Sequence, residues 1–122
     1  MTSSDLSEQR VLILEDDFLV ADETAAIVRA AGATVIGPHA AEHAAFEDIL
    51  YEVPTVAVLD IGLHGQPSFE FARTLRDIGV PFVFLTGYDA DVVPQDLGDA
   101  PHLPKPIEPR RLVDTLERLV AE

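Results

Sequence analysis

The order of apolar and amphipathic segments predicts a single α/β domain built on a doubly wound parallel sheet. Five short apolar runs with the character of strands alternate with helical or helix-like segments, and no repeat or long linker interrupts them. Such alternation implies right-handed crossovers and helices on both faces of the sheet. The central run, residues 56–60, is apolar up to its final Asp60, as expected of a strand buried on both faces. With 122 residues, of which 48% are hydrophobic, the chain is large enough for one core.

The first half of the chain contains two predicted strands and two predicted helices. The strands are expected at residues 10–14 and 34–37, and the helices at residues 17–31 and 40–51. Asp17 is a suitable N-cap for the first helix, and Gly32 is a suitable C-terminal stop. Pro38 is expected to help end the second strand, and Pro54 to end the second helix.

The second half continues the pattern less regularly. Strands are expected at residues 56–60, 80–85 and 101–104, and helices at residues 69–78 and 109–120. Ser68 is a suitable cap for the helix at 69–78, and Gly79 a suitable stop. Residues 89–100 hold four aspartates, a proline and a glycine with few apolar positions, so we expect only a short or irregular helix there, mobile in solution.

Each predicted helix carries apolar residues that define the face it should bury. Those expected to face the core are Phe18, Val20, Ile27, Val28, Ala44, Ala45, Ile49, Leu50, Phe71, Ala72, Leu75, Ile78, Leu112, Val113, Leu116, Leu119 and Val120.

Composition excludes several classes of function. The chain has no cysteine, so disulfides and thiolate zinc sites are excluded. No apolar run has membrane-spanning length and the start lacks a signal-peptide pattern, so we expect a cytoplasmic protein without a membrane partner. The net charge of −14 disfavours nucleic acid as a partner. Residues 1–9 are polar and are expected to form a flexible N-terminus.

Chemically active side chains follow the predicted strands at the points where the strands end. Glu15 and Asp16 follow the first strand, Asp60 ends the central strand, and Thr86 and Lys105 follow the fourth and fifth strands. The carboxyl ends of parallel strands share one edge of the sheet, where α/β proteins bind their ligands. If the first and central strands are neighbours, the three carboxylates meet there, and an ionised Asp60 needs a partner to offset its desolvation.

This combination resembles the receiver domain of bacterial two-component response regulators. The resemblance runs from about Arg10 to Val120 and rests on an acidic pair after strand 1, Asp after strand 3, Thr after strand 4 and Lys-Pro after strand 5. It implies a flavodoxin-like or CheY-like sheet of order 2-1-3-4-5, an order that periodicity alone does not give. It also implies that residues 10–122 form the receiver domain and that no output domain accompanies them.

The resemblance assigns a role to each of these side chains. Asp60 corresponds to the phosphoacceptor, Thr86 to the switch hydroxyl and Lys105 to the phosphate-binding lysine. Glu15 and Asp16 correspond to the acidic pair that holds Mg²⁺ together with Asp60, and Gly62 to the residue whose backbone carbonyl also binds the metal. The chemistry fits, because Mg²⁺ prefers oxygen ligands and neutralises charge when a carboxylate attacks a phosphoryl group to form an aspartyl phosphate.

The chain departs from the common receiver pattern at two positions. His64 replaces the usual proline four residues after the acceptor, and His102 replaces the aromatic switch residue three positions before the lysine. Residues 81–88 resemble the Phe-Ala-Thr-Gly motif of the atypical FAT GUY response regulators, although Leu85 stands where that motif has alanine. That subclass consists mostly of single-domain receivers of alphaproteobacteria, associated with histidine kinases of the HWE and related types and with the general stress response. The histidines His39, His43, His64 and His102 are not at metal-ligand spacing and are interpreted as loop or surface residues.

The predicted function is therefore that of a stand-alone receiver in a phosphorelay. It would accept a phosphoryl group from a sensor histidine kinase or a histidine phosphotransferase, as a monomer or weak dimer, and signal through an unknown downstream protein or serve as a phosphate sink. It would catalyse only its own phosphotransfer and slow dephosphorylation. Residues 88–100 are expected to report the phosphorylated state, with Tyr88 rather than His102 as the moving ring. The alternatives are a metal-dependent small-molecule phosphohydrolase and a degenerate receiver that binds a partner constitutively.

Overall fold

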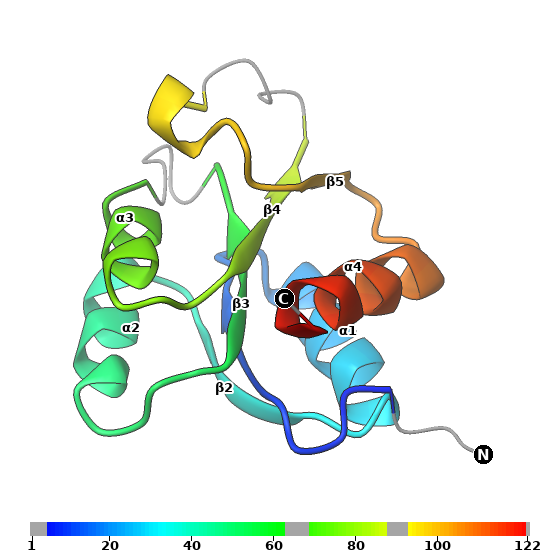
Figure 1. Cartoon of the computed structure of the whole chain (residues 1–122). Helices are drawn as coiled ribbons and strands as arrows, with labels where there is room; N and C mark the ends of the chain where they lie inside the picture. Colours follow the sequence, from blue (N-terminus) through cyan, green and yellow to red (C-terminus); the bar gives the residue numbers. More distant parts are fainter. Residues whose placement is uncertain (1–4, 63–68, 88–92, 122) are drawn as a thin grey trace.

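The computed structural model describes residues 5–62, 69–87 and 93–121, and it confirms the predicted fold class. A parallel sheet of order β2-β1-β3-β4-β5 forms the centre, with α1 and α4 against one face and α2 and α3 against the other (Figure 1). The strands are β1 (Arg10–Leu14), β2 (Thr34–His39), β3 (Val56–Asp60), β4 (Phe82–Thr86) and β5 (His102–Pro104). The helices are α1 (Phe18–Ala30), α2 (Glu42–Ile49), α3 (Phe69–Asp77), the 3₁₀ helix η3 (Gln95–Leu97) and α4 (Pro109–Ala121).

Strand alternation divides the core into two layers, one on each face of the sheet. All five residues of β3 are buried, which confirms the interpretation of residues 56–60 as a central strand. Val58 belongs to the layer shared with α1 and α4, whereas Leu59 belongs to the layer shared with α2 and α3. The helices therefore cover the apolar side chains on both faces of the sheet. The polar side chain of β3 lies at the carboxyl end of the strand.

The ends of α1 follow the predicted capping. The Asp17 carboxylate accepts hydrogen bonds from the backbone N–H groups of Leu19 and Val20 at 3.0 and 3.2 Å. Gly32 has a φ of 101°, the left-handed conformation that suits glycine after a helix. This helix begins directly after the acidic pair, so its cap also fixes the loop that carries Glu15 and Asp16.

Strand β2 is longer than predicted. It passes through Pro38 to His39, with a shift in its pairing to β1 between Leu12 and Leu14. The expectation that Pro38 helps to end the strand is wrong, because the backbone of His39 regains a partner: its carbonyl accepts a hydrogen bond from the Glu15 N–H at 2.8 Å. This bond ties the end of β2 to the first acidic residue of the site.

Three residues predicted to face the core are exposed instead. Phe18, Leu50 and Ile78 have exposed fractions of 75, 78 and 48%. Each residue lies at or beyond the end of its helix, where no neighbouring element covers the apolar face. The spacing of apolar residues therefore predicted the buried face of each helix correctly, but not how far along the helix that face is covered. In α2 the ring of Phe46 packs instead, edge-on against Phe71 at a centroid distance of 5.0 Å.

The described part of the N-terminal segment makes contacts that a flexible segment would not. Leu6 is fully buried in the layer under α1 and α4, and its N–H donates to the Ala31 carbonyl at 2.8 Å. Asp5 forms an ion pair with Arg110 at 3.1 Å. The expected flexibility therefore does not extend to residues 5 and 6. Residues 1–4 lie outside the described part of the chain.

The irregular segment before β5 is fixed to α3 by two arginines. Arg73 donates to both carboxylate oxygens of Asp96 at 3.0 and 3.2 Å. Arg76 contacts Asp99 at 3.1 Å and donates to the Asp96 carbonyl at 2.6 Å. Leu97 is fully buried beneath them, so the short, irregular helix that the sequence predicts is present but anchored. The rest of that predicted segment, residues 89–92, and the predicted cap Ser68 lie outside the described residues. In the described ranges no helix is long and apolar enough to cross a membrane.

Candidate functional site

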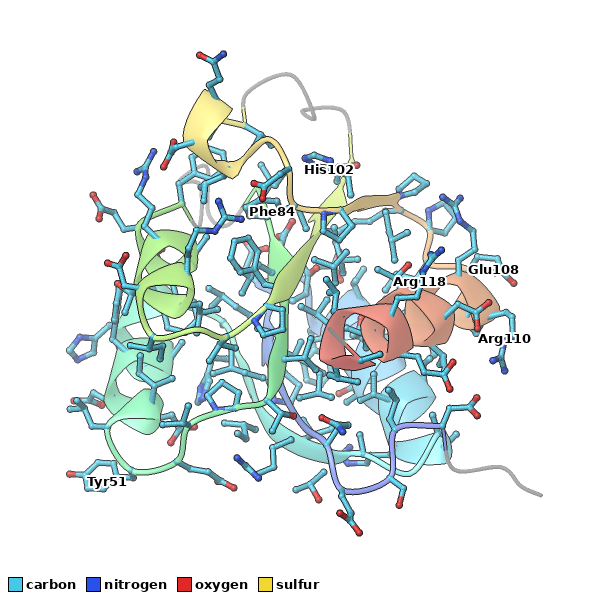
Figure 2. All side chains as sticks on the ribbon, viewed as in Figure 1. Tyr51, Phe84, His102, Glu108, Arg110 and Arg118 are labelled. Atoms are coloured by element: carbon cyan, nitrogen blue, oxygen red, sulfur yellow. The ribbon has the colours of Figure 1, made fainter. Side chains whose placement is uncertain are left out.

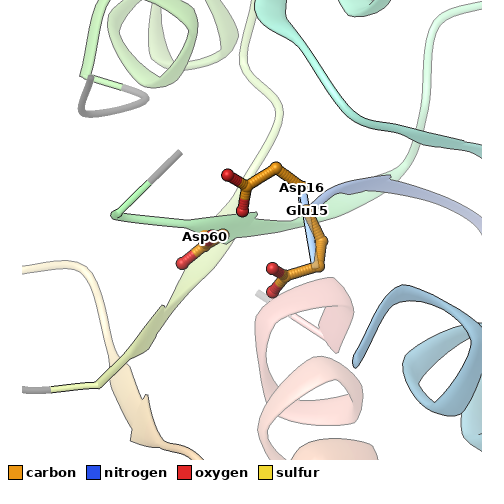
Figure 3. A group of neighbouring side chains, drawn as sticks. All are labelled: Glu15, Asp16 and Asp60. Atoms are coloured by element: carbon orange, nitrogen blue, oxygen red, sulfur yellow. The ribbon is translucent and has the colours of Figure 1, made fainter. Parts of the chain in front are cut away.

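Three carboxylates converge at the carboxyl edge of the sheet, as the sequence predicts. Glu15 and Asp16 follow β1 and Asp60 ends β3, and these strands are hydrogen-bonded neighbours. One oxygen from each lies within 4.8 Å of the others (Figure 3). Glu15 and Asp60 are only 2 and 4% exposed, whereas Asp16 is half-buried. The cluster therefore concentrates negative charge in a place with little water to stabilise it.

Lys105 supplies the positive charge at this edge. Its Nζ atom lies 3.1 Å from Asp60 Oδ1 and 3.1 Å from Glu15 Oε1. Lys105 follows β5, and its backbone N–H donates to the Thr86 carbonyl at 2.8 Å, which sets the direction of the chain as it leaves the sheet. It is also the only lysine in the sequence. The structure thus places Lys105 at the predicted edge of the sheet, where it contacts two of the three carboxylates.

Charge crowding and burial change the acidity of Glu15. Burial raises the pKa of Glu15 to about 7, and the negative charge of Asp60 raises it further. The hydrogen bonds from the Asp17 N–H and from Lys105 act in the opposite direction and lower the pKa. For Lys105, burial acts to lower the pKa, but the hydrogen bonds to Glu15 and Asp60 outweigh it and the pKa lies above its ordinary value. One cation therefore does not fully compensate the buried acids.

Gly62 lies close to the acceptor carboxylate through its backbone. Its N–H donates to Asp60 Oδ1 at 3.1 Å, the same oxygen that Lys105 contacts. A side chain at Gly62 would begin 3.9 Å from that oxygen, an ordinary contact, so steric crowding by Asp60 does not demand a glycine. The predicted role of its carbonyl as a metal ligand stays a prediction.

Thr86 ends β4 beside the site. The residue is 6% exposed, and its strand neighbour Leu85 pairs with Asp60 in the sheet register. The Ile61 N–H donates to the Leu85 carbonyl at 3.2 Å, which continues the pairing past the acceptor. Thr86 thus occupies the predicted strand end, and its role as a switch stays a prediction.

Two histidines have contacts that the interpretation as loop or surface residues did not include. His39 Nε2 lies 2.6 Å from Asp48 Oδ2 and joins the end of β2 to α2. The His102 ring stacks on Phe84 with a centroid distance of 5.8 Å, and its Nε2 is buried without a hydrogen-bond partner in the described residues. Periodicity gave no signal for either contact, because each depends on the neighbouring strand or helix rather than on local spacing. His64 lies outside the described residues.

The donor set fits a divalent cation. Carboxylate oxygens are the ligands that Mg²⁺ prefers, and Mg²⁺ is commonly held by one or two of them with several waters. Glu15 Oε1 is buried and contacts Lys105 without the alignment of a hydrogen bond, so it retains the capacity to bind a cation. Glu15, Asp16 and Asp60 are the residues that would hold the metal.

Comparison with known proteins gives consistent matches over most of the chain. No protein-family model matches it. The chain is 30% identical over 113 residues to the sensory transduction protein LytT of Bacillus subtilis, covering 89% of this chain and 47% of that protein. It spans a third to a half of the length of the curated relatives it matches.

Two solved structures match nearly end to end. A putative response regulator from Chloroflexus aurantiacus J-10-fl superimposes with a TM-score of 0.83 at 26% identity, over 93% of this chain and 98% of that chain. SdrG from Sphingomonas melonis Fr1 does so with a TM-score of 0.81 at 28% identity, over 98 and 99%. Taken with the sheet order and the acidic cluster, these matches identify the chain as a receiver (CheY-like) domain of response regulators over nearly its whole length.

Proposed function

We propose that this receiver accepts a phosphoryl group on Asp60 from a phosphohistidine, with Mg²⁺ held by Glu15, Asp16, Asp60 and the Gly62 carbonyl. The observation that carries the proposal is the contact of Lys105 Nζ with Asp60 Oδ1 at 3.1 Å beside two further carboxylates. A structural ion pair would need only one acid, whereas three acids and one cation suit a site that receives both a metal and a phosphoryl group.

The residues of the chain divide the work of the transfer. A carboxylate oxygen of Asp60 forms a bond to phosphorus as the P–N bond of the donor breaks, and the donor imidazole leaves with the electron pair of that bond. Lys105 and the Gly62 N–H both hold Asp60 Oδ1 and thereby fix the orientation of the carboxylate. Bound Mg²⁺ would supply neutralisation of the charge that the carboxylate and the phosphoryl oxygens bring together.

The product would change the pairing of two residues. An aspartyl phosphate removes the negative charge that Lys105 now faces on Asp60 and presents phosphoryl oxygens instead. We propose that Lys105 and the Thr86 hydroxyl bind those oxygens. Both residues flank the segment 87–104, so the change would reach η3 and the residues before it. Tyr88, proposed as the ring that moves, lies outside the described residues.

The finer assignment is to a stand-alone receiver of the FAT GUY type. It is supported by the Thr86-Gly87 pair at the end of β4 and by the match to SdrG over nearly the full length of both chains. Receiver domains partner with histidine kinases. For this chain we propose a kinase of the HWE or related type, or a histidine phosphotransferase, within a stress-response pathway in the cytoplasm. We propose that residues 10–122 form the domain and that it is a monomer or weak dimer. Its signal passes by protein contacts or ends as a phosphate sink.

Two other functions are less well supported. A small-molecule phosphohydrolase would need a general acid beside the acceptor, and Gly62 offers only its N–H to Asp60. A degenerate receiver would not need the buried acids and the lysine in contact, because their burial is costly. Neither alternative function explains why three carboxylates and one lysine lie together at this edge of the sheet.

Phosphorylation with a small donor separates these functions. We expect incubation with acetyl phosphate and Mg²⁺ to give one phosphate per chain that alkali or hydroxylamine releases, and Asp60→Ala to abolish it with the fold intact by circular dichroism. Asp77→Asn, which removes an exposed acid at the C-terminal end of α3, is the matched control and should leave labelling unchanged. Continuous turnover of phosphate esters would favour the hydrolase, and absence of labelling in the wild type would favour the degenerate receiver.

A further inference from the structure

Three apolar side chains form an exposed patch where α2 leads into β3, at the amino edge of the sheet. Leu50, Tyr51 and Val53 are 78, 88 and 48% exposed, and the first two are the most exposed large apolar side chains in the part of the chain that the structure describes. Figure 2 shows Tyr51 beyond the end of α2, at the margin of the molecule. These three residues, here called the amino-edge patch, are separated from Asp60 by the length of β3, about 15 Å.

The fold does not require this exposure. The last turn of α2 already packs Phe46 and Ile49 against the layer that it shares with α3, and the patch follows after the helix has covered its face of the sheet. Single exposed apolar residues are normal on a protein surface, but three within four residues make a contiguous patch of the kind that marks interaction sites. The other exposed pair, Phe18 and Leu19, begins α1 at the opposite edge, beside the acidic pair, and is a separate feature.

Hydrogen bonds hold the backbone of the patch in place. The Nε and Nη2 atoms of Arg10 in β1 both donate to the Val53 carbonyl, at 3.1 and 2.9 Å. The Arg10 N–H donates to Thr55 Oγ1 at 2.8 Å, and the Tyr51 N–H donates to the Asp48 carbonyl at 3.0 Å. A backbone that is ordered before binding reduces the entropy lost when a partner docks. The loop therefore presents its apolar side chains to solvent on a fixed support.

The charge around the patch is negative. Residues 42–53 contain four acids and neither lysine nor arginine. Glu47 lies 3.6 Å from the exposed ring of His43, and Glu52 lies 3.9 Å from Arg10. Exposed pairs at these separations are weak and are screened by salt, so both carboxylates are available to a cationic partner. The patch is thus an apolar centre with an acidic rim.

We propose that the amino-edge patch binds an amphipathic segment of a partner protein, with apolar side chains at its centre and lysine or arginine at its rim. The Tyr51 ring would be the main contact, since an aromatic ring buries about 150–250 Å² and has few rotatable bonds to fix. Leu50 and Val53 extend the apolar centre. Glu47 and Glu52 would meet the basic side chains, which orient the segment and speed its association.

Charge disfavours the other occupants of such a patch. A second copy of the chain would bring its own net charge of −14, and a symmetric contact would place Glu47 and Glu52 of both copies around the same apolar centre. An anionic membrane would be repelled for the same reason. A basic segment is attracted both by the rim and by the charge of the whole domain, so the chemistry of the patch points to that partner.

This inference goes beyond phosphotransfer and does not depend on it, so its test uses the unphosphorylated chain. The probe is a dye-labelled helical peptide of about 16 residues, with leucines along one face and lysines beside them. Fluorescence anisotropy measures its binding, and amide shifts of ¹⁵N-labelled protein locate it. One comparison peptide has glutamate in place of lysine, and another has serine in place of leucine. We expect shifts centred on residues 50–53 with the first peptide, and at least tenfold weaker binding of the other two.

Paired variants decide whether the patch is responsible. Leu50→Ser should weaken binding of the lysine peptide about tenfold, a loss expected when one leucine contact is removed. Leu19→Ser is the matched control, because that leucine is 76% exposed, against 78% for Leu50, and lies at the opposite edge. Glu47→Gln and Glu52→Gln should each weaken binding about threefold, whereas Glu23→Gln, at an exposed acid of α1, should not. All these side chains are exposed, so circular dichroism should show an intact fold.

Several results would overturn the proposal. An equal loss with Leu19→Ser, or shifts centred on α1, would place the peptide at the other exposed pair. Equal binding of the glutamate peptide would remove the role of the acidic rim. A wild-type dimer in sedimentation velocity that Leu50→Ser dissociates would assign the patch to a second copy, and Leu50-dependent binding to phosphatidylglycerol vesicles would assign it to a membrane. No binding by a folded wild type would show that the patch has no such ligand. None of these outcomes bears on labelling of Asp60, so the two proposals fail separately.

Discussion

Two groups of charges join distant parts of this chain, and they differ in burial and in balance. At the carboxyl edge of the sheet, one lysine contacts two almost fully buried carboxylates of a cluster of three. Between α3 and η3, two arginines face two aspartates at the surface, and the side chains remain 39 to 76% exposed. The first group is unbalanced and shielded from water, and the second is balanced and solvated.

The difference teaches what each arrangement is suited to do. Buried unbalanced charge destabilises the fold and is relieved by a ligand, so it is found where a ligand is expected. Exposed balanced pairs contribute little to global stability but hold one segment near another. Ion pairs therefore belong to the candidate phosphorylation site at the edge of the sheet, whereas on the surface they hold the segment before β5 against α3.

Removal of the lysine should give the largest effect. Lys105→Met leaves Glu15 and Asp60 buried without their cation, and we expect a loss of about 3 kcal/mol in the free energy of unfolding at pH 7.5 without Mg²⁺. Urea denaturation measures it. Arg111→Met, at an exposed arginine without an ion pair in the described residues, is the control. A loss no greater than that of the control would show that Lys105 does not compensate the cluster.

The pH dependence of stability should identify Glu15. Its pKa is about 7 in the folded chain and 4.5 as the ordinary value, so the folded state binds the proton more tightly. Its contribution to stability is therefore greatest at low pH and falls as pH rises from about 4.5 to 7. The free energy of unfolding of Glu15→Gln, minus that of the wild type, should rise by about 2 kcal/mol between pH 5 and pH 8. If this difference in the free energy of unfolding did not change with pH, the raised pKa would not belong to Glu15.

Mg²⁺ should stabilise the wild type by a smaller amount. At a concentration about ten times the dissociation constant, the gain is about 1.4 kcal/mol. A thermal melt at constant ionic strength measures it, with NaCl as the control salt. Glu15→Gln and Asp16→Asn should raise the metal-free midpoint and reduce the gain. Equal responses of wild type and variants to Mg²⁺ would mean that the cation binds outside the cluster.

The surface arginines should give the smallest effect, and a local one. Arg73→Gln removes the bidentate contact to Asp96, so amide exchange at Leu97 and Ala100 should become faster while the global midpoint stays nearly unchanged. About 0.5 M NaCl should have the same effect in the wild type, because solvated pairs are screened. Slowed exchange, or a large loss of global stability, would contradict the contrast with the buried cluster.

Much of the fold was predictable because it depends on local patterns. The apolar runs gave β1 and β3 with their observed bounds, and the alternation gave the parallel sheet. The strand order came from the family resemblance and not from periodicity. The exposure of Phe18, Leu50 and Ile78 was not predicted, because a helix stripe does not reveal where its neighbour ends.

For the site, sequence order placed the acids and the lysine at the correct edge, since parallel strands share their carboxyl ends. It could not give the contacts across the chain. The pairs of Arg73 with Asp96 and of His39 with Asp48 depend on how α3 and α2 pack, and no spacing marks them.

The solitary lysine has a practical consequence for anyone who modifies this protein. The chain has only two kinds of primary amine, the terminal amine and the Nζ atom of Lys105, which contacts Asp60 and Glu15. Coupling to a dye, a bead or a sensor chip through the amine of Lys105 would therefore block the site, whereas coupling through the terminal amine would leave Lys105 unmodified. Conversely, the raised pKa of Lys105 keeps its amine protonated and slow to acylate. Its acylation rate, followed by mass spectrometry, would report at a single atom whenever a metal, a phosphoryl group or a substitution alters its pairing.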